Sequence, residues 1–394
     1  MSRLFPRILI VVLVLAVTFG SGAYVGMNVL SRGAESSFQL PPILQDEELD
    51  FTTVEYVWNL LNTEYVGANG LDRQAILQGA IRGMLGALDD PYTVFFDDTE
   101  TSEFLQGLNG TFEGVGIEVS LEEGGLTVIS PLKDSPAQLA GIQAGDIIVA
   151  IDGTSAVGIT LDEAVTKIRG PRDSQVVLRV LRDGKETDIT VTRDTILVPS
   201  VRYEKKEGDV AYIEILQFSE DTDVEFERAA QRALNDGATS IVLDLRYNPG
   251  GYLEAAVDVA GWFTPRNTLV VTEREGSGET RQHRAQGPSS LSDIPVVILQ
   301  NQGSASASEI LAGVLRDARS APIVGEKSFG KGTVQTLEEL AGGTSIKFTI
   351  ARWITPSGQE INGTGIEATV FVEENLETPE DEQLTRALEV AKGL

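Results

Sequence analysis

A serine-rich turn between a strand-like run and a helix-like run carries the side chains best suited to chemistry. The apolar run Val296–Leu299 is short and bounded by turn residues, which predicts a buried strand. The run Ser304–Glu309 leads into a predicted amphipathic helix, whose apolar side carries Ile310, Leu311, Val314 and Leu315. A helix N-terminus presents unpaired N–H groups and the positive end of the helix dipole, which stabilise a developing anion. The segment therefore predicts serine hydroxyls that could act as nucleophiles, next to a helix N-terminus that could bind the resulting anion.

A serine nucleophile needs a base, and the sequence offers two types. The chain contains one histidine, His283, in a polar stretch among arginines. A lysine serves instead when burial lowers its pKa enough to leave the amine neutral. Lys331 suits this role because it lies between two glycines and precedes a strand-like run, so that Lys331, Thr333 and Gln335 share a face. Gln335 could then orient the Lys331 amine, as the third member of a triad orients the base.

These two runs resemble the carboxy-terminal processing peptidases, which are serine proteases with a Ser-Lys catalytic dyad. The similar runs are Ser304–Ile310 and Ser328–Gln335, and Lys331 lies twenty-five residues after Ser306, which is the spacing of the family. The resemblance implies that Ser306, rather than the other two serines of its run, is the nucleophile. It also implies that Lys331 is the general base and that Gln335 is its hydrogen-bonding partner.

Each motif also has an ordinary structural explanation. Ser306 and Glu309 form the S-x-x-E pattern of a helix capping box, and an isolated lysine such as Lys331 is typically a solvated surface residue. The agreement of two separate motifs in sequence and in spacing favours catalysis over these explanations. A Ser306–His283 pair is a third hypothesis, and it predicts that a His283→Ala variant is inactive.

A second turn predicts a donor for the oxyanion. The buried-strand pattern Ile241–Leu245 runs into the Asn-Pro-Gly-Gly turn at residues 248–251, and a helical pattern follows. Glycines at such a turn allow a backbone N–H to point into a cleft. In the family this run supplies one oxyanion donor, and the residue after the nucleophile supplies the other. The resemblance therefore implies Ala307 together with either Gly250 or Gly251, and the choice between the glycines stays open.

Residues 107–194 predict a small β-rich domain that resembles a PDZ domain. Leu161–Ile168 predicts a helix, and the Asp-Gly pair at residues 183–184 predicts a hairpin. PDZ domains bind an extended peptide at a sheet edge and hold its terminal carboxylate on loop N–H groups. The resemblance assigns the carboxylate loop and the apolar pocket to Gly114, Val115, Gly116, Ile117, Val165 and Ile168.

Two of these residues, and the arginine that follows the helix, need a separate interpretation. Val165 and Ile168 fit an ordinary hydrophobic core as well as they fit a pocket. Arg169 matches an arginine proposed in the family to link the PDZ domain to the protease core, although by sequence alone it is a cation at a helix end.

The rest of the chain alternates strand and helix patterns, which predicts an α/β fold with an at least partly parallel sheet. The resemblance implies a crotonase/ClpP-like protease core with an inserted PDZ domain and an N-terminal helical segment. We expect five regions: a transmembrane signal anchor or signal peptide (1–33), a linker and helical region (34–106), the PDZ domain (107–194), the Ser-Lys peptidase core (195–376), and a C-terminal tail or helix (377–394).

The first thirty-three residues differ from the rest of the chain. Arg3 and Arg7 precede the mostly apolar run Ile8–Met27, which is long enough to cross a bilayer as a helix. The early arginines place the N-terminus in the cytoplasm and the rest outside. The small residues 21–23 alternatively fit the cleavage site of a signal peptide. Both explanations place the bulk of the chain on the periplasmic or cell-surface side, either membrane-anchored or, after cleavage, secreted.

Composition excludes several kinds of function. The chain has 394 residues, enough for two or three domains, and its net charge of −28 argues against nucleic-acid binding. It contains no cysteine, which excludes disulfides, thiolate metal sites and a cysteine nucleophile. With one histidine a zinc site is disfavoured, so we expect neither a metal nor a cofactor.

The function that these patterns predict is an extracytoplasmic serine endopeptidase that cleaves proteins near or from their C-terminus. The PDZ domain would bind the free C-terminus of a protein or peptide substrate, and Ser306 would form an acyl-enzyme with Lys331 as base. The alternative is a non-catalytic binding or scaffold protein, which a serine hydrolase probe on Ser306 distinguishes. Family members often self-associate through terminal helices, which leaves a homo-oligomer open.

Overall fold

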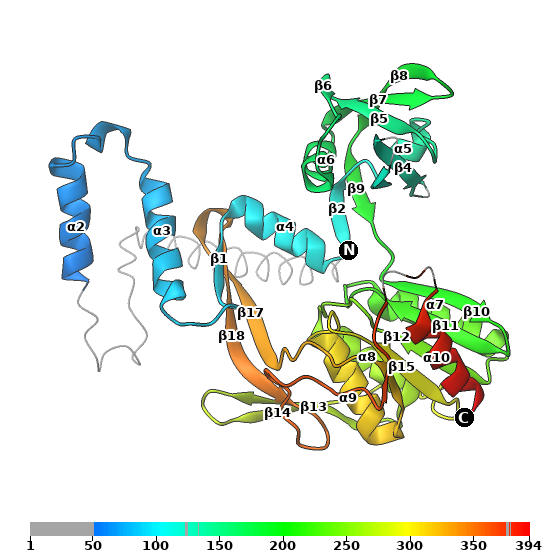
Figure 1. Cartoon of the computed structure of the whole chain (residues 1–394). Coiled ribbons are helices and arrows are strands. Elements are labelled where there is room, and N and C mark those ends of the chain that lie inside the picture. Colours follow the sequence, from blue (N-terminus) through cyan, green and yellow to red (C-terminus); the bar gives the residue numbers. More distant parts are fainter. Residues whose placement is uncertain (1–50, 123–124, 133, 376–377, 379) are drawn as a thin grey trace, which may run out of the picture. The chain divides into compact units, whose positions relative to one another are not determined.

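The computed structural model describes residues 51–122, 125–132, 134–375, 378 and 380–394 (Figure 1). The expected membrane anchor or signal peptide at residues 1–33 lies outside the described residues. Within the described part, no helix combines the length and apolar character that a membrane span requires. The chain divides into two compact units, residues 1–73 and 74–394.

Short helices make up the described N-terminal region. The first unit contains α2 (Thr52–Thr63) and the 3-10 turn η2 (Ala68–Gly70). Helix α3 (Arg73–Gly86) begins at the end of that unit and belongs almost entirely to the second. Helix α4 (Asp98–Leu108) starts with a capping box in which the Asp97 and Glu100 side chains accept each other's backbone N–H.

A separate sheet and core form the PDZ-like region. Its strands lie in the order β3-β4-β5-β7-β8, and β6 pairs with β5. Their bounds are β3 (Ile117–Glu122), β4 (Gly125–Pro131), β5 (Ile147–Ile151), β6 (Thr154–Ser155), β7 (Gln175–Arg182) and β8 (Lys185–Thr192). Two helices, α5 (Pro136–Leu139) and α6 (Leu161–Ile168), accompany the sheet. The predicted hairpin turn is confirmed, because Arg182 pairs with Lys185 across residues 183–184.

Two short strands lead into and out of this region. Strand β2 (Thr111–Gly114) pairs antiparallel with β9 (Asp194–Leu197). The PDZ-like region between residues 115 and 193 is therefore closed at its base by a two-stranded ribbon, as expected for a domain inserted into another.

A six-stranded, mainly parallel sheet forms the centre of the remaining chain. Its order is β10 (Val201–Lys206), β11 (Val210–Ile215), β12 (Ser240–Asp244), β15 (Val296–Gln300), β16 (Ile323–Gly325) and β19 (Val370–Phe371). Only the β10–β11 pair is antiparallel. Every residue of β12 and β15 is buried, because helices cover both faces of the sheet. This arrangement confirms the predicted α/β pattern.

Alternate residues of these strands belong to two different hydrophobic cores. Ile241, Leu243 and Ile298 share one core with α7 (Thr222–Asn235), α8 (Leu253–Phe263) and α9 (Ala307–Arg319). Val242 and Val297 face the other side and share a core with Ala387 and Ala391 of α10 (Glu382–Lys392). The C-terminal helix is therefore part of the core fold.

A second sheet lies against this layered core. Its long strand β18 (Ser345–Ile354) pairs with β1 (Val94–Phe96), β13 (Leu269–Glu275) and β17 (Thr333–Glu339), and β13 also pairs with β14 (Thr280–Arg284). The turn η3 (Ala341–Gly343) joins β17 to β18. Through β1, residues 94–96 become part of the sheet that carries the lysine-bearing loop.

Candidate active site

A cleft of about 740 Å³ brings together residues that are distant in the sequence. It is lined by all six residues predicted to act in catalysis or in the oxyanion hole: Gly250, Gly251, Ser306, Ala307, Lys331 and Gln335. Charged residues from other elements line it too: Glu103, Glu254, Glu273, Glu275, Arg281 and Lys347. The parallel sheet explains why the Gly250 turn and the Ser306 turn meet, because β12 and β15 end side by side and each is followed by one of these turns.

Ser306 differs from the two serines that flank it in the run. Ser304 Oγ donates to the Leu245 carbonyl (2.8 Å), and Ser308 Oγ donates to the Asn248 carbonyl (2.9 Å). Both flanking side chains are buried, whereas Ser306 is half-buried and lines the cleft. Ser306 also has a φ of +55°, an uncommon backbone conformation for a residue with a side chain. The turn therefore holds one hydroxyl toward the cleft and uses the other two to fix itself.

The glycine turn touches the serine turn directly. A Cβ atom on Gly250 would lie 2.8 Å from Ser306 Cβ and 3.0 Å from the Ala307 nitrogen. Gly250 and Gly251 also have φ values of +102° and +139°, so both the space and the backbone conformation require glycine.

The two glycines differ in how their N–H groups are used. The Gly250 N–H donates to Asn248 Oδ1 at 2.9 Å. Gly251 forms a parallel bridge with Phe218, in which the flanking backbone groups bond to Phe218 and the Gly251 N–H points away from it. Within the described chain, neither the Gly251 N–H nor the Ala307 N–H has an acceptor. These two donors are therefore available to an oxyanion.

Lys331 lies in an environment that favours the neutral amine. Burial lowers the pKa of Lys331, and the neighbouring positive charge of Lys347 lowers it further, while the Glu309 carboxylate raises it. The Lys331 Nζ lies 5.1 Å from the centre of the Tyr92 ring. Its backbone is held by a hydrogen bond from the Lys331 N–H to Glu309 Oε2 and one from Trp353 Nε1 to the Lys331 carbonyl. The described residues include no hydrogen bond between Lys331 Nζ and Ser306 Oγ.

Gln335 lines the same cleft but bonds to other partners. Its Nε2 donates to Thr333 Oγ1 at 2.8 Å and to Thr349 Oγ1 at 3.3 Å. Thr333 and Gln335 lie two residues apart on β17, so their side chains share a face and can bond to each other. The expected contact between Gln335 and the Lys331 amine is not formed in this arrangement.

Aromatic rings that the sequence analysis did not identify lie beside both cleft lysines. Tyr92 lies beside Lys331, and Phe96 and Phe104 lie beside Lys347; we call these three rings the aromatic wall. The Lys347 Nζ lies 5.4 Å and 4.9 Å from the ring centres of Phe96 and Phe104, which stack on each other at 5.0 Å. Burial lowers the pKa of Lys347 as well. The wall comes from the segment around β1 and α4, which reaches the cleft only because β1 pairs with β18. No local pattern in the sequence indicates that long-range pairing.

The histidine lies on a different part of the second sheet. His283 is on β14, where its Nε2 lies 2.9 Å from Glu273 Oε2 and both side chains are 12% exposed. Glu273 lines the cleft, but His283 is not among the lining residues. The geometry therefore brings Lys331, rather than His283, into the same cleft as Ser306.

Among its described strands, the PDZ-like region leaves one edge of its sheet unpaired. The loop at residues 114–117 precedes β3, and β3 is the edge strand of its sheet, so one side of β3 is unpaired by the described strands. Val115 is 1% exposed and Ile168 is 4% exposed, and both belong to the core of this region. Val165 is half-buried and lies one turn before Ile168 on α6. Of the two helix residues predicted for the pocket, Val165 is the accessible one.

Two further PDZ residues have specific neighbours. Gly116 has a φ of +73°, and a Cβ on it would lie 2.5 Å from Ser135 Cβ, so the loop packs too tightly for a side chain. The Arg169 guanidinium lies 4.7 Å from the centre of the Phe112 ring on β2. Arg169 thereby connects the end of α6 to one strand of the ribbon that closes the region.

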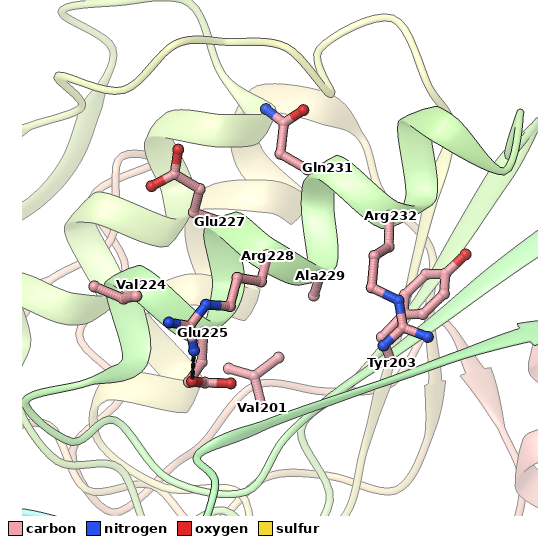
Figure 2. A pocket seen from close by; sticks show the side chains of 9 residues that line it. All are labelled: Val201, Tyr203, Val224, Glu225, Glu227, Arg228, Ala229, Gln231 and Arg232. Atoms are coloured by element: carbon pink, nitrogen blue, oxygen red, sulfur yellow. Dashed lines mark hydrogen bonds and ion pairs between the residues drawn. The ribbon is translucent and has the colours of Figure 1, made fainter.

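A second hollow, of about 660 Å³, lies between β10 and α7 and carries no comparable chemistry. Figure 2 shows Glu225 paired with Arg228, and Arg232 beside Tyr203. The Arg232 guanidinium lies 4.7 Å from the Tyr203 ring centre. Its lining residues include neither a serine nor a lysine. We therefore take the cleft at Ser306 as the candidate active site.

Comparison with known families and proteins assigns the chain to a family. The profile of peptidase family S41 matches residues 209–372, a PDZ-domain profile matches residues 127–182, and the profile of the N-terminal domain of the activating protease CtpB matches residues 15–101.

Individual relatives are similar along most of their length. A probable CtpA-like serine protease of Staphylococcus epidermidis is 40% identical over 85% of this chain and 68% of its own. The carboxy-terminal processing protease CtpB of Bacillus subtilis is 36% identical over 90% of this chain and 75% of its own. The solved structure of the photosystem II D1 C-terminal processing protease is 30% identical, with a TM-score of 0.51 over 84% of this chain and 90% of its own.

Proposed function

This chain belongs to the PDZ-containing serine proteases of peptidase family S41, and from that premise we propose that it cleaves protein chains through an acyl-enzyme on Ser306. The observation that carries the proposal is the shared cleft, which Ser306 and Lys331 both line. Burial lowers the pKa of Lys331 in this cleft. A nucleophile and a neutral amine in one partly closed site are the minimum that acyl transfer requires.

The proposed reaction uses Lys331 as the proton carrier. Neutral Lys331 accepts the Ser306 proton while Oγ attacks the peptide carbonyl carbon, and the developing oxyanion binds the N–H groups of Ala307 and Gly251. When the C–N bond breaks, Lys331 returns the proton to the leaving amine. A water molecule then gives its proton to Lys331 and attacks the ester, and Lys331 finally restores the Ser306 hydroxyl.

The resting geometry requires one movement before this reaction. The Lys331 Nζ lies over the Tyr92 ring and has no hydrogen bond to Ser306 in the part of the chain described here. Rotation about the side-chain bonds of Lys331 would bring its Nζ to Ser306 Oγ. We propose that Gln335 completes the arrangement by turning from Thr333 toward the Lys331 amine when substrate enters.

We also propose that the PDZ domain selects substrates by their free C-terminus. An extended tail would add to the unpaired edge of β3, with its carboxylate on the loop at residues 114–117 and its last side chain against Val165. Tail binding would deliver the chain to Ser306 and would direct cleavage to sites near a C-terminus. Arg169 would transmit this binding from α6 to β2 through its contact with the Phe112 ring.

The location of the reaction is a proposal from residues 1–33 alone. Their arginine-flanked apolar run supports an extracytoplasmic protease held by, or released from, an N-terminal membrane segment. Protease added to spheroplasts should degrade the C-terminal part of the chain. Protection of that part until the membrane is permeabilised would contradict this location.

Cleavage of a disordered protein tests the proposed function. The purified full chain is incubated with casein beside its Ser306→Ala variant, and fragments are identified by mass spectrometry. We expect cleavage by the parent chain and none by the variant. Equal cleavage by both would refute Ser306 as the nucleophile.

A further inference from the structure

A buried glutamate connects the two segments that carry Ser306 and Lys331. Glu309 lies in the first turn of α9 and is 0% exposed. Its Oε1 accepts hydrogen bonds from Ser328 Oγ (2.6 Å) and the Gly330 N–H (2.8 Å). Its Oε2 accepts from the Ser306 N–H and the Lys331 N–H, both at 2.9 Å. One side chain therefore binds the backbone of both proposed catalytic residues.

The hydrogen-bond pattern requires an ionised carboxylate. Three of the four donors are backbone N–H groups, and the fourth is the Ser328 hydroxyl. Since Ser328 Oγ itself accepts the Ile366 N–H at 2.7 Å, its hydrogen is free to point at Glu309. Burial raises the pKa of Glu309, and the four donors act in the opposite direction. Each carboxylate oxygen accepts two hydrogen bonds, which leaves no lone pair free to carry a proton.

These contacts exceed what helix capping needs. In a capping box the glutamate accepts only the N–H of the cap residue, which here is Ser306. The other three bonds reach the loop at residues 328–331, about twenty residues later in the chain. The loop passes the N-terminal end of α9 at this point. The carboxylate therefore fixes the position of the Lys331 backbone relative to Ser306.

We propose that Glu309 is a positioning residue of the protease, holding the Ser306 turn and the Lys331 loop at a fixed separation through its carboxylate. The inference rests on the proposed Ser306–Lys331 dyad. Glu309 does not touch the substrate, and it transfers no proton. Its contribution is preorganisation, because a displacement of about 1 Å between reacting groups can cost on the order of 100-fold in rate.

The same carboxylate has an electrostatic effect that a purely structural residue lacks. Its charge raises the pKa of Lys331, opposing burial and the charge of Lys347. The other charged residues that line the cleft, Glu103, Glu254, Glu273, Glu275 and Arg281, are unchanged by a substitution at position 309. Removing the Glu309 charge therefore lowers the pKa of Lys331. Because Lys331 acts when neutral, the acid limb of the pH–rate profile then moves to lower pH.

The test compares the purified full chain with Glu309→Gln and Glu163→Gln in casein cleavage across pH. Glu163 is the matched control, since it completes the capping box of α6 with Thr160 but is exposed. We expect Glu309→Gln to lower kcat about 100-fold, since it loses acceptors for backbone donors at both reacting residues, with KM changed less than about three-fold. Its acid limb should move to lower pH, and Glu163→Gln should keep both kcat and the limb.

The outcomes separate this inference from the proposed function. Cleavage that survives in Ser306→Ala refutes the proposed function. A Glu309→Gln variant that keeps kcat within about two-fold, or that loses kcat with an unmoved acid limb, overturns the role of Glu309. If Glu309→Gln fails to fold by circular dichroism, Ser328→Ala decides, because it removes one donor and keeps the carboxylate. We then expect kcat to fall about ten-fold, and an unchanged kcat overturns the inference.

Discussion

Two helices of this molecule begin with the same short sequence pattern and use it differently. Helix α6 starts at Thr160 with Glu163 three residues later, and helix α9 starts at Ser306 with Glu309 three residues later. In α6 the cap residue has an extended backbone, and among the described residues the Glu163 side chain accepts hydrogen bonds from Thr160 alone. In α9 the cap residue has a φ of +55° and the glutamate is buried among four donors.

This comparison shows that the segments packed around a capping motif decide whether it becomes part of a functional site. Around α6 the cap is open to solvent, so its side chains satisfy only the helix end. Around α9 a glycine turn and a lysine-bearing loop converge on the helix end. The strained serine is then held toward a cleft, and the glutamate joins two segments. Substitutions at matched positions of the two regions should therefore differ sharply in effect.

The largest expected difference lies at the cap residues themselves. Ser306→Ala should lower kcat on the order of 10⁴-fold or more, because it removes the nucleophile. Thr160→Ala should instead destabilise its region by about 1 kcal/mol, the usual effect of losing a helix cap. Casein cleavage and thermal unfolding of the full-chain variants measure the two effects. Comparable loss of cleavage in both variants would contradict the distinction.

A second comparison uses two lysines of one loop. Lys331→Ala should lower kcat by about 10²- to 10⁴-fold through loss of the general base. Lys327→Ala should leave kcat within about two-fold, because Lys327 forms only an exposed ion pair with Glu367. Steady-state kinetics on casein distinguish them. A Lys331→Ala variant with parental kcat would show that another group accepts the Ser306 proton.

A third comparison separates core from groove on α6. Ile168→Ala should destabilise the PDZ-like region by about 2–5 kcal/mol, because Ile168 is 4% exposed within its core. Val165→Ala should cost less stability and weaken binding of a C-terminal peptide. Thermal unfolding and fluorescence anisotropy with a labelled peptide report the two effects. Unchanged peptide affinity in Val165→Ala would remove that residue from the groove.

The smallest expected effect concerns pH rather than maximal rate. Lys347→Met removes a positive charge that lowers the pKa of Lys331, so the pKa of Lys331 should rise. A smaller fraction of Lys331 is then neutral at a given pH, and the acid limb of the pH–rate profile should move to higher pH. This is the opposite direction from Glu309→Gln. A pH–rate profile of Lys347→Met with an unmoved limb would show that Lys347 does not influence the base.

The sequence alone predicted those features that depend on local patterns. The serine turn, the glycine turn and the lysine loop each lie next to a recognisable strand or helix, and the family spacing selected Ser306 and Lys331. Gly250 and Gly251 could not be separated, because the choice depends on the bridge to Phe218 and on the Asn248 side chain.

Features that depend on long-range packing were not predictable. The aromatic wall needs β1 to pair with β18, which joins Phe95 to Ile346 across most of the chain. The additional bonds of Glu309 need a loop about twenty residues away to fold back on α9. Gln335 finds Thr349 through the β17–β18 pairing, which directs its amide away from the expected partner.

Covalent labelling tests the central claim most directly. The full chain, Ser306→Ala and Lys331→Ala are treated with a fluorophosphonate, and the modified peptide is identified by mass spectrometry. We predict an adduct on the Ser306 oxygen in the parent chain, none in Ser306→Ala, and much slower labelling in Lys331→Ala. An adduct on another residue, or equally fast labelling of Ser306 without Lys331, would contradict a Ser306 nucleophile activated by Lys331.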